Sequence, residues 1–568
     1  MSIPSVSTKG KASHTFDAIV IGSGISGGWA AKEFCEKGLQ TLVLERGRNV
    51  EHGDYPTAML ESWQRAYRGR NTPEFNRANP ILTQVGAVND ADRDFFVPDA
   101  EHPYVQKQPF SWIKGYQVGG KSLLWARWTQ RWSEADFEAN SRDGHGVDWP
   151  IRYRDLAPWY SYVEKFVGIA GNRDGLPQIP DGEYLPPMEM NALEKHLKAQ
   201  IETNFPDRNL VISRTANLTQ QRGNRGPCQY RSRCNRGCPY AGYFSSNSAT
   251  LPAANATGRL TMRPFSVVHS IIYDETQQKA VGVRVIDTNT LETTEFFARV
   301  IFVNAATINS TLLLLNSTSE RFPQGLGNDS AQLGRNLMDH NYRVKGYASH
   351  DGFKDRYYSG RRPTGVLIPK FRNVGTDKQE NFLRGYAFSA GGMRNRGNIG
   401  PDTPPIGAGF KKALSEPGSW GMWLGSMAEM LPHPENRITL SATQTDRWGM
   451  PQVEINAVHR ENEEAMVKDM LVTAEEMFHA GGFRNINVRD SKEPIGLGIH
   501  EMGTARMGRN PRTSVLNAHN AIHAVPNVYV TDGACMTSSS WQNPSITYMA
   551  LTARAVDHAV QQFNRHEI

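Results

Sequence analysis

A glycine-rich turn between two apolar runs near the N-terminus limits most strongly how this chain can fold. Residues 16 to 21 read FDAIVI, GSGISGGWAAKEFCEKG follows at once, and a second apolar run, TLVLE, ends at Glu45. Apolar, β-branched runs of this length are typical of buried parallel strands. The pattern therefore predicts strand, turn, helix and strand in succession, the start of a Rossmann-like α/β domain.

The glycines of the turn fit the spacing G-x-G-x-x-G. Gly22 permits the tight turn, Gly24 lets the backbone approach a pyrophosphate, and Gly27 lets helix and strand pack closely. Glu45 is placed to bind ribose hydroxyls, and an acidic residue there argues against a 2′-phosphate. A glycine turn alone can be purely structural, but together with the strands, the helix and Glu45 it predicts a dinucleotide site for FAD or NAD.

Length and charge narrow the possible classes of protein. At 568 residues the chain should contain two or more structural units. The sequence contains no run of about 18 apolar residues, so it predicts no membrane-spanning helix. The net charge of +6 is spread over 63 basic and 57 acidic residues, too diffuse to indicate nucleic-acid binding. MSIPSVSTKGKASHTF, at the N-terminus, lacks the apolar core of a secretion signal, so the default location is the cytoplasm.

Three of the five cysteines, Cys228, Cys234 and Cys238, lie within eleven positions in PCQYRSRCNRGCPY. A disulfide framework would need more cysteines in a smaller chain. Thiolates are preferred ligands of iron-sulfur clusters, and no fourth Cys or His is nearby for structural zinc. Free or partly disulfide-bonded cysteines that stabilise a loop are the alternative.

Arginines surround these cysteines and are expected to lower the pKa values of the thiols and to offset the charge of a cluster. They are Arg222, Arg225, Arg231, Arg233 and Arg236. The remaining cysteines, Cys35 and Cys535, are predicted to be buried fillers.

Four further stretches carry a resemblance to a known family. They are GYQVGGKSLLWARWTQRW (115–132), VNAATINSTLLLLNS (303–317), LGRNLMDH (333–340), and HEMGTARMG with NVYVTDGACMTSSSWQNPSITYMALTARA near the C-terminus. With the glycine turn, they resemble the glucose-methanol-choline (GMC) family of FAD-dependent oxidoreductases across nearly the whole chain. The details are most similar to its sugar-oxidising branch, which includes pyranose oxidases, gluconate and glucose dehydrogenases and, as the nearest resemblance, the glucoside 3-dehydrogenase large subunit.

The resemblance implies that the dinucleotide is FAD. Gly119, Gly120 and Ser122 would then border the flavin, and Asp532 and Gly533 would lie near the FAD pyrophosphate. Their alternative role is turn geometry alone. Pyranose oxidases that attach FAD covalently carry a histidine two residues after the serine of this motif, where this chain has Leu124. FAD is therefore expected to bind without a covalent bond.

The resemblance also implies how electrons leave the flavin. Related catalytic subunits hold a three-iron (3Fe-4S) cluster on a similarly spaced triplet, which implies cluster ligands at Cys228, Cys234 and Cys238. Such a cluster would relay electrons to a partner. The expected partners are a small subunit that carries an export signal and a cytochrome or other acceptor, so residence in the periplasm is expected, with the cytoplasm as the alternative.

The same resemblance places a catalytic pair at His500 and Asn543. Removing hydride from a sugar carbon also requires a base for the hydroxyl proton and a polar group that holds the oxygen. His500 is predicted to be the general base, with a pKa near the working pH, and Asn543 to orient the hydroxyl. In isolation either residue could be structural, since Asn543 precedes Pro544 and could cap the following helix.

The expected architecture is an α/β GMC fold with two domains. The Rossmann-like FAD-binding domain is predicted to combine residues 14–135, 227–342 (with the iron-sulfur loop) and 495–568. A substrate domain with an antiparallel sheet is predicted at 343–494, with 136–226 as its lid segment.

Local patterns add detail to the substrate domain. GSWGMWLGSMAEM, NRITL and PQVEIN are strand-like runs expected to share the antiparallel sheet over the flavin. ENEEAMVKDMLVTAEEMFHAGG has helical periodicity and ends at glycine.

The predicted function is an FAD-dependent sugar dehydrogenase that oxidises a ring secondary hydroxyl, expected at C3 of a glucoside, to a ketone. The alternatives are a pyranose or C-glycoside oxidase that uses oxygen, a gluconate or glucose dehydrogenase catalytic subunit, and a non-catalytic flavoprotein that acts as a scaffold.

Overall fold

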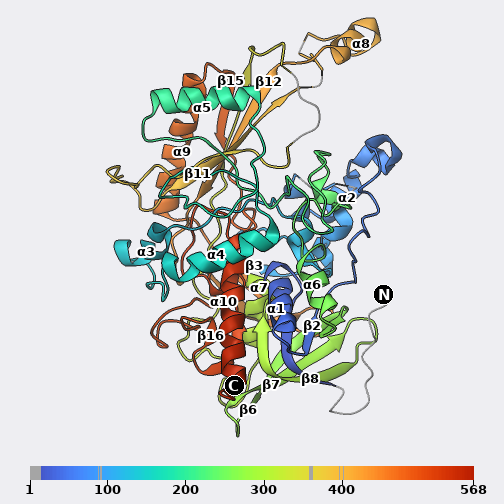
Figure 1. Ribbon diagram of the computed structural model, residues 1–568, viewed down its shortest axis with the longest axis vertical. Coiled ribbons are helices and arrows are strands. Elements are labelled where there is room, and N and C mark those ends of the chain that lie inside the picture. The colour runs from blue at the N-terminus through green and yellow to red at the C-terminus, as the bar shows by residue number, and fades with distance from the viewer. Residues whose placement is uncertain (1–13, 87, 90–91, 357–361, 396, 401) are drawn as a thin grey trace.

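A computed structural model describes residues 14–86, 88–89, 92–356, 362–395, 397–400 and 402–568. Residues 1–13 lie outside these ranges, and they form most of the N-terminal stretch in which a secretion signal was sought. The described chain is elongated, with one large sheet in its lower half and another in its upper half, and α4 (Tyr153–Val167) crosses the middle (Figure 1). None of the described helices combines the length and apolar character that crossing a bilayer requires.

The lower sheet contains the strands that the apolar runs predict. β1 (Thr15–Ile21) lies parallel to β2 (Thr41–Leu44) on one side and to β8 (Thr293–Val303) on the other. β5 (Leu260–Arg263) continues the sheet beyond β2, and β17 (Val525–Val530) continues it beyond β8. In chain order these parallel strands lie third, second, first, fourth and fifth, which is a doubly wound order. The predicted Rossmann-like topology is confirmed.

Antiparallel strands complete this sheet. β6 (Ser266–Asp274) pairs with β7 (Lys279–Asp287), β7 pairs with β8, and β16 (Ala521–Ile522) pairs with β17. Nucleotides bind open α/β sheets at the carboxyl ends of the strands where the strand order reverses. β1 lies at that reversal, so the glycine turn that follows it is at the position where a nucleotide is expected.

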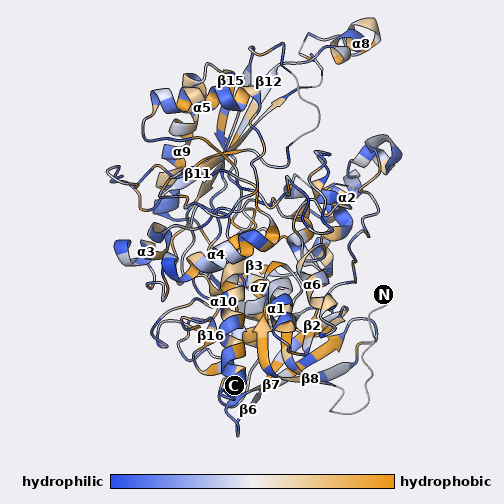
Figure 2. Ribbon diagram, viewed as in Figure 1, coloured by the Kyte–Doolittle hydropathy of each residue, from blue (hydrophilic) through white to orange (hydrophobic). Residues whose placement is uncertain are grey.

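Both faces of the lower sheet are covered, which explains why its strands are apolar throughout. Ala18 and Val20 of β1 share an apolar cluster with α1 (Ile25–Glu36) and α10 (Ser545–Asn564). Ile19 and Ile21 point to the other face and share a cluster with α7 (Thr307–Asn316). Figure 2 shows these strands in apolar colours, whereas many surface loops and helix ends are hydrophilic.

The upper sheet is antiparallel and, within the described residues, has six strands. Their order is β15 (Arg484–Asp490), β9 (Val344–His350), β12 (Trp420–Ala428), β11 (Tyr386–Arg394), β10 (Val366–Ile368) and β4 (Val211–Ile212). The predicted amphipathic helix is α9 (Glu461–Ala480), which packs with α5 (Ala192–Asn204) against this sheet. The antiparallel sheet and the helix are therefore confirmed.

One predicted strand grouping is wrong. β13 (Arg437–Thr445) and β14 (Pro451–Asn456) do not join β12 in the upper sheet, but form a separate small sheet with β3 (Val105–Gln106). The pairing of β14 with β3 joins residues far apart in the sequence, which strand propensity alone cannot reveal. The other α-helices in the described ranges are α2 (Pro73–Ala78), α3 (Glu134–Asp143), α6 (Thr250–Ala256) and α8 (Gly407–Ser415).

Candidate active site

The glycine turn after β1 is closely packed on one side and open on the other. Gly22 has a φ of +96°, and a Cβ atom there would lie 2.4 Å from the carbonyl oxygen of Asn304. A Cβ atom on Gly27 would lie 1.8 Å from the carbonyl oxygen of Gly22. By contrast, a Cβ atom on Gly24 would have no heavy atom within 4 Å. The backbone of Gly24, at the N-terminus of α1, is thus accessible to a phosphate, as the motif predicts.

Glu45 connects the turn to a second loop. Its Oε2 accepts hydrogen bonds from the hydroxyl of Ser23, at 2.6 Å, and from the backbone N–H of Ser23, at 3.2 Å. The same hydroxyl accepts a hydrogen bond from the backbone N–H of Gly119, at 2.9 Å. Burial raises the pKa of Glu45. Glu45 therefore orders the turn itself, and its contact with a ribose stays a prediction.

The predicted flavin loop lies against the glycine turn. Gly119 has a φ of +89°, and a Cβ atom on Gly120 would lie 3.2 Å from the Cα atom of Gly24. The hydroxyl of Ser122 donates to the carbonyl of Gly119, at 2.5 Å, and accepts from the backbone N–H of Ser246, at 3.0 Å. Two motifs that lie about a hundred residues apart in the chain therefore form one surface.

Asp532 and Gly533 complete this region from the C-terminal end of the chain. Asp532 Oδ1 accepts from the backbone N–H of Ala534, at 3.0 Å, and burial raises the pKa of Asp532 to about 6. A Cβ atom on Gly533 would lie 2.3 Å from the carbonyl oxygen of Glu501 and from Thr307 Oγ1. The end of β17 thus lies beside the N-terminus of α7 and next to the segment that carries His500.

The chemistry of this region fits FAD. Several buried polar atoms beside the predicted motifs have no hydrogen-bond partner within the described residues: Asn247 Oδ1, Thr250 Oγ1 and Asn304 Nδ2. Asn247 Oδ1 and Thr250 Oγ1 lie next to Gly119 and Gly28, and the backbone of Asn304 lies next to Gly22. A ligand with phosphate and hydroxyl groups would supply partners to such atoms, which are costly when left unpaired.

A buried carboxylate shapes the segment that carries His500. Asp339 Oδ1 accepts from the backbone N–H of His500, at 3.0 Å, and Oδ2 accepts from Gly496 and Gly498, at 2.9 and 3.0 Å. Burial, with a smaller effect of nearby Glu501, raises the pKa of Asp339 to about 7. Asp339 belongs to the LGRNLMDH motif but was not among the predicted site residues, because the motif does not reveal what the carboxylate contacts.

The structure brings the predicted catalytic pair together. His500 Nε2 lies 3.4 Å from Asn543 Nδ2, and His500 Nδ1 lies 2.8 Å from His340 Nδ1. The side-chain oxygen of Asn543 is buried and has no partner among the described residues. These atoms provide a base, an amide donor and a vacant acceptor at one place, although the roles of both residues stay predictions.

The predicted pKa of His500 is wrong. Burial, followed by the effects of His340 and Lys121, holds the pKa of His500 well below its ordinary value rather than near the working pH. The sequence could not show this, because a side chain becomes desolvated only when segments from several parts of the chain enclose it. His500 is consequently neutral and able to accept a proton at neutral pH.

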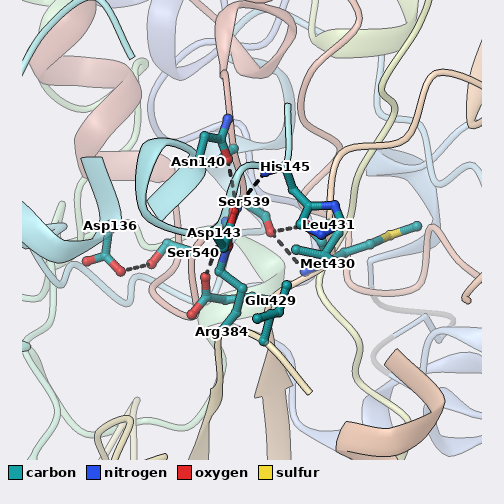
Figure 3. A network of polar contacts seen from close by, with 12 residues as sticks. Asp136, Asn140, Asp143, His145, Arg384, Glu429, Met430, Leu431, Ser539 and Ser540 are labelled. Atoms are coloured by element: carbon teal, nitrogen blue, oxygen red, sulfur yellow. Dashed lines mark hydrogen bonds and ion pairs between the residues drawn. The ribbon is translucent and has the colours of Figure 1, made fainter. Parts of the chain in front are cut away.

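A polar network anchors the segment between the two predicted catalytic residues (Figure 3). Ser540 donates from its hydroxyl to Asp136 Oδ1, at 2.9 Å, and Asn140 donates from its amide to the carbonyl of Thr537, at 3.0 Å. Ser539 exchanges two hydrogen bonds with the backbone of Met430, at 2.8 and 2.9 Å. The segment is therefore fixed between α3 and the end of β12.

Arg384, which lies two residues before β11, also supports this network. Its Nη2 donates to Asn140 Oδ1, at 2.8 Å, and to Asp143 Oδ1, at 3.2 Å. Figure 3 shows Arg384 between Asp143 and Glu429. Sequence reasoning missed these residues, since they are single polar positions in separate segments without a common motif.

The three neighbouring cysteines lie in a loop that is half-buried. Backbone N–H groups approach two of their sulfur atoms: Tyr230 N–H at 3.5 Å from Cys228 Sγ, and Gly242 N–H at 3.4 Å from Cys238 Sγ. Burial raises the pKa of Cys228 to about 11. The expectation that arginines lower the thiol pKa values is therefore wrong for Cys228.

The arginines of this loop have other partners. Arg231 and Arg236 donate to the backbone carbonyls of Ala58 and Leu60, at 2.6 and 3.1 Å, and Arg233 forms an ion pair with Glu61. Arg225 donates to the carbonyl of Val167, at 2.9 Å. These contacts hold the loop against neighbouring segments.

The structure does not support the predicted iron-sulfur cluster. In the described part of the chain, no group of three or more His, Cys, Asp or Glu side chains is arranged to hold a metal ion. Each of the five cysteines, all within the described ranges, is a free thiol, and Cys35 and Cys535 are buried as predicted.

Comparisons with known proteins agree with this fold. Two sequence models described as GMC oxidoreductase match residues 16–342 and 432–552. The 2-methyl-1,2-propanediol dehydrogenase of Mycolicibacterium austroafricanum is 26% identical over 96% of each chain. The fructose dehydrogenase large subunit of Gluconobacter japonicus is 25% identical over 95% of this chain and 97% of its own. Formate oxidase from Aspergillus oryzae RIB40 shares the fold, with a TM-score of 0.63 at 15% identity over 97% of this chain and 99% of that chain.

The glycine turn yields a paired prediction. Gly27→Ala is expected to prevent FAD binding, because the new Cβ atom would collide with the backbone of Gly22. Gly24→Ala has space for the Cβ atom and is expected to leave the apoprotein's thermal unfolding unchanged. It should nevertheless weaken FAD binding about tenfold or more, since the pyrophosphate loses its close approach to the backbone.

The measurements are FAD titration by fluorescence quenching and thermal unfolding of the apoprotein. Gly86→Ala is the matched control, because a Cβ atom there also meets nothing within 4 Å and the position lies outside the predicted nucleotide motifs. FAD binding by Gly24→Ala at the parent affinity would contradict the assignment of this surface to the pyrophosphate.

The lowered pKa of His500 predicts a flat pH profile. Protonation removes the lone pair of the base, and a pKa below the ordinary value moves this loss to more acidic pH. The rate constant of flavin reduction by saturating substrate without oxygen should therefore show no inflection near pH 6.5, the ordinary pKa of histidine, and should fall only at more acidic pH. Stopped-flow absorbance checks this, and an inflection near the ordinary pKa of histidine would contradict it.

Proposed function

The chain belongs to the GMC oxidoreductase family, and we propose that within this family it is a sugar dehydrogenase that oxidises a ring secondary hydroxyl to a ketone. The coarser activity, FAD-dependent oxidation of CH–OH groups, follows from the family and from relatives named as dehydrogenases of an alcohol and of a sugar. The sugar, the C3 position and the electron acceptor belong to the proposal.

The contact between His500 and Asn543 carries the proposal. His500 is neutral, so Nε2 can accept the proton of a substrate hydroxyl. The Asn543 amide lies beside it and can donate a hydrogen bond to the same oxygen while negative charge develops there. Bound FAD would supply the acceptor for the hydride.

The choice of a sugar rests on two lines of support. The motifs resemble the sugar-oxidising branch, and one relative that is aligned over nearly its whole length is named a fructose dehydrogenase. The buried acceptor of Asn543 also suits a substrate with several hydroxyl groups, because it could receive a hydrogen bond from one of them. The C3 position comes from the resemblance alone. An oxidase that uses oxygen and a gluconate or glucose dehydrogenase are the alternatives.

The route of the electrons after the flavin is also part of the proposal. A small partner subunit is supported by the name of the fructose dehydrogenase relative, a large subunit. Export with that subunit to the periplasm, with the cytoplasm as the alternative, and transfer to a cytochrome or other acceptor stay proposals. Relay through a cluster on Cys228, Cys234 and Cys238 rests on the sequence resemblance only.

Anaerobic flavin bleaching tests the substrate class. A panel of D-glucose, methyl α-D-glucopyranoside, D-fructose, D-gluconate and 2-methyl-1,2-propanediol would be mixed with the FAD-loaded enzyme, and products would be identified by NMR. The glucoside is expected to bleach the flavin and to yield a 3-keto product. Bleaching by the diol alone would contradict the sugar assignment. Stoichiometric hydrogen peroxide in air would favour the oxidase alternative.

The His500→Ala variant tests the base. The first-order rate constant for flavin reduction by the best panel compound is expected to fall by about 10²-fold or more, with FAD still bound. His479→Ala is the matched control, because His479 lies in the last turn of α9 and is exposed. Reduction of His500→Ala at the parent rate would require another base.

Iron analysis tests the cluster. The sequence resemblance predicts three iron atoms per chain and an iron EPR signal after anaerobic purification, whereas the structure provides no support for either. Cys238→Ser should then lose the iron, and Cys35→Ala, which alters a buried cysteine elsewhere, should retain it. Iron-free protein that is fully active with its physiological acceptor would exclude the cluster.

A further inference from the structure

The buried histidine His340 lies directly behind His500. The rings of His340 and His500 have centroids 4.9 Å apart and planes inclined at 85°, and their Nδ1 atoms are 2.8 Å apart. His340 is 2% exposed. A hydrogen bond between two Nδ1 atoms needs a proton on one ring and a bare lone pair on the other, so the tautomers of the two rings are coupled.

The other contact of His340 decides its tautomer. His340 Nε2 is hydrogen-bonded to the backbone carbonyl of Ser540. A carbonyl oxygen only accepts, so Nε2 carries the hydrogen. Burial lowers the pKa of His340 to about 4, which keeps the ring neutral. Its Nδ1 therefore presents a bare lone pair toward His500.

The tautomer of His500 then follows. Since His340 Nδ1 accepts, His500 Nδ1 must carry the hydrogen that it donates across the 2.8 Å contact. A neutral imidazole has one N–H, so His500 Nε2 is left bare. That atom faces the amide of Asn543, at 3.4 Å, which can donate to it until a substrate hydroxyl takes its place.

We propose that His340 is a positioning residue that holds His500 in the tautomer whose Nε2 is the base. The inference rests on the proposed function, in which His500 takes the hydroxyl proton. When Nε2 gains that proton, the bond from His500 Nδ1–H to His340 becomes charge-assisted and stabilises the imidazolium. The proton does not pass onward through His340, because the chain of contacts ends at a carbonyl that cannot become an N–H or O–H donor.

The surrounding structure keeps this carbonyl in place. The side chain of Ser540 donates to Asp136 Oδ1, and Gln542 donates from its amide to Asp136 Oδ2, each at 2.9 Å. Figure 3 shows Ser540 and Asp136 of this anchor. Asp339, beside His340 in the chain, holds the backbone of His500. Asp339 thus fixes the backbone of His500, and His340 fixes its ring.

Two substitutions of similar size separate this role from simple packing. His340→Asn can place its side-chain oxygen near the position of Nδ1 and accept from His500. His340→Gln places its amide near Nε2, where it can donate to Ser540 but leaves His500 Nδ1 without its acceptor. The glutamine variant should slow anaerobic flavin reduction at saturating substrate by about tenfold or more, and the asparagine variant should stay within about threefold of the parent.

The substrate is methyl α-D-glucopyranoside, or the panel compound that bleaches the parent flavin if that glucoside does not. The substrate concentration that gives half-maximal rate is expected to change little in both variants, because His340 acts through His500. Equal rates for the two variants, or a parent rate for His340→Gln, would overturn the proposal.

A double variant shows whether His340 acts through His500. Adding His340→Gln to His500→Ala should slow reduction no further, since the residue being positioned is already gone. Additive losses would overturn the proposal. If flavin reduction is slow in His500→Ala but proceeds at the parent rate in His340→Gln, only the role of His340 is rejected. If it proceeds at the parent rate in His500→Ala, His500 is rejected as the base.

If the glutamine variant fails to bind FAD, a second test of His340 uses His340→Ala. His340→Ala leaves space for added imidazole, which could accept from His500 Nδ1. Imidazole is expected to restore part of the rate of flavin reduction in His340→Ala. In the double variant that also carries His500→Ala, imidazole is expected to leave the rate unchanged. No restoration in FAD-loaded His340→Ala would count against the proposal.

Discussion

The carboxylate of Asp339 is the interaction on which the candidate site depends. It is buried and accepts backbone N–H groups from His340, Gly496, Gly498 and His500, at 2.8 to 3.0 Å. A buried N–H that loses its partner costs about 1–3 kcal/mol, so several such groups on one carboxylate determine the path of the loop. Burial raises its pKa to about 7 because the charged form is desolvated, and the N–H groups act in the opposite direction.

The site is a junction between distant parts of the chain. His500 and Asn543 belong to the C-terminal segment, yet the residues that hold them lie on α3, in the LGRNLMDH motif and at the end of β12. Arg384 of the upper region also donates to α3. Because side chains from both halves fix this segment, the relative placement of the two sheets and the geometry of the base are linked.

Burial also changes the chemistry that residue type alone would suggest. A histidine ordinarily titrates near pH 6.5, but desolvation keeps His500 neutral, which suits a base that must be ready at neutral pH. At Cys228 the same effect raises the pKa of the thiol, and the neighbouring arginines bind backbone carbonyls or Glu61 instead. Basic residues close in the sequence therefore do not define the electrostatic surroundings of a side chain.

The sequence by itself determined the elements that depend on local pattern. β1, the glycine turn, β2 and α9 follow from apolar periodicity and from the absence of a side chain at Gly22, Gly24 and Gly27. Family motifs singled out His500 and Asn543 as candidates, whose catalytic roles stay predictions. Only the tertiary structure decided that β14 pairs with β3, that Glu45 binds Ser23 and that His340 contacts His500. These features arise where separate segments meet, and burial and hydrogen-bond pairing there depend on the whole packed chain rather than on any one stretch of it.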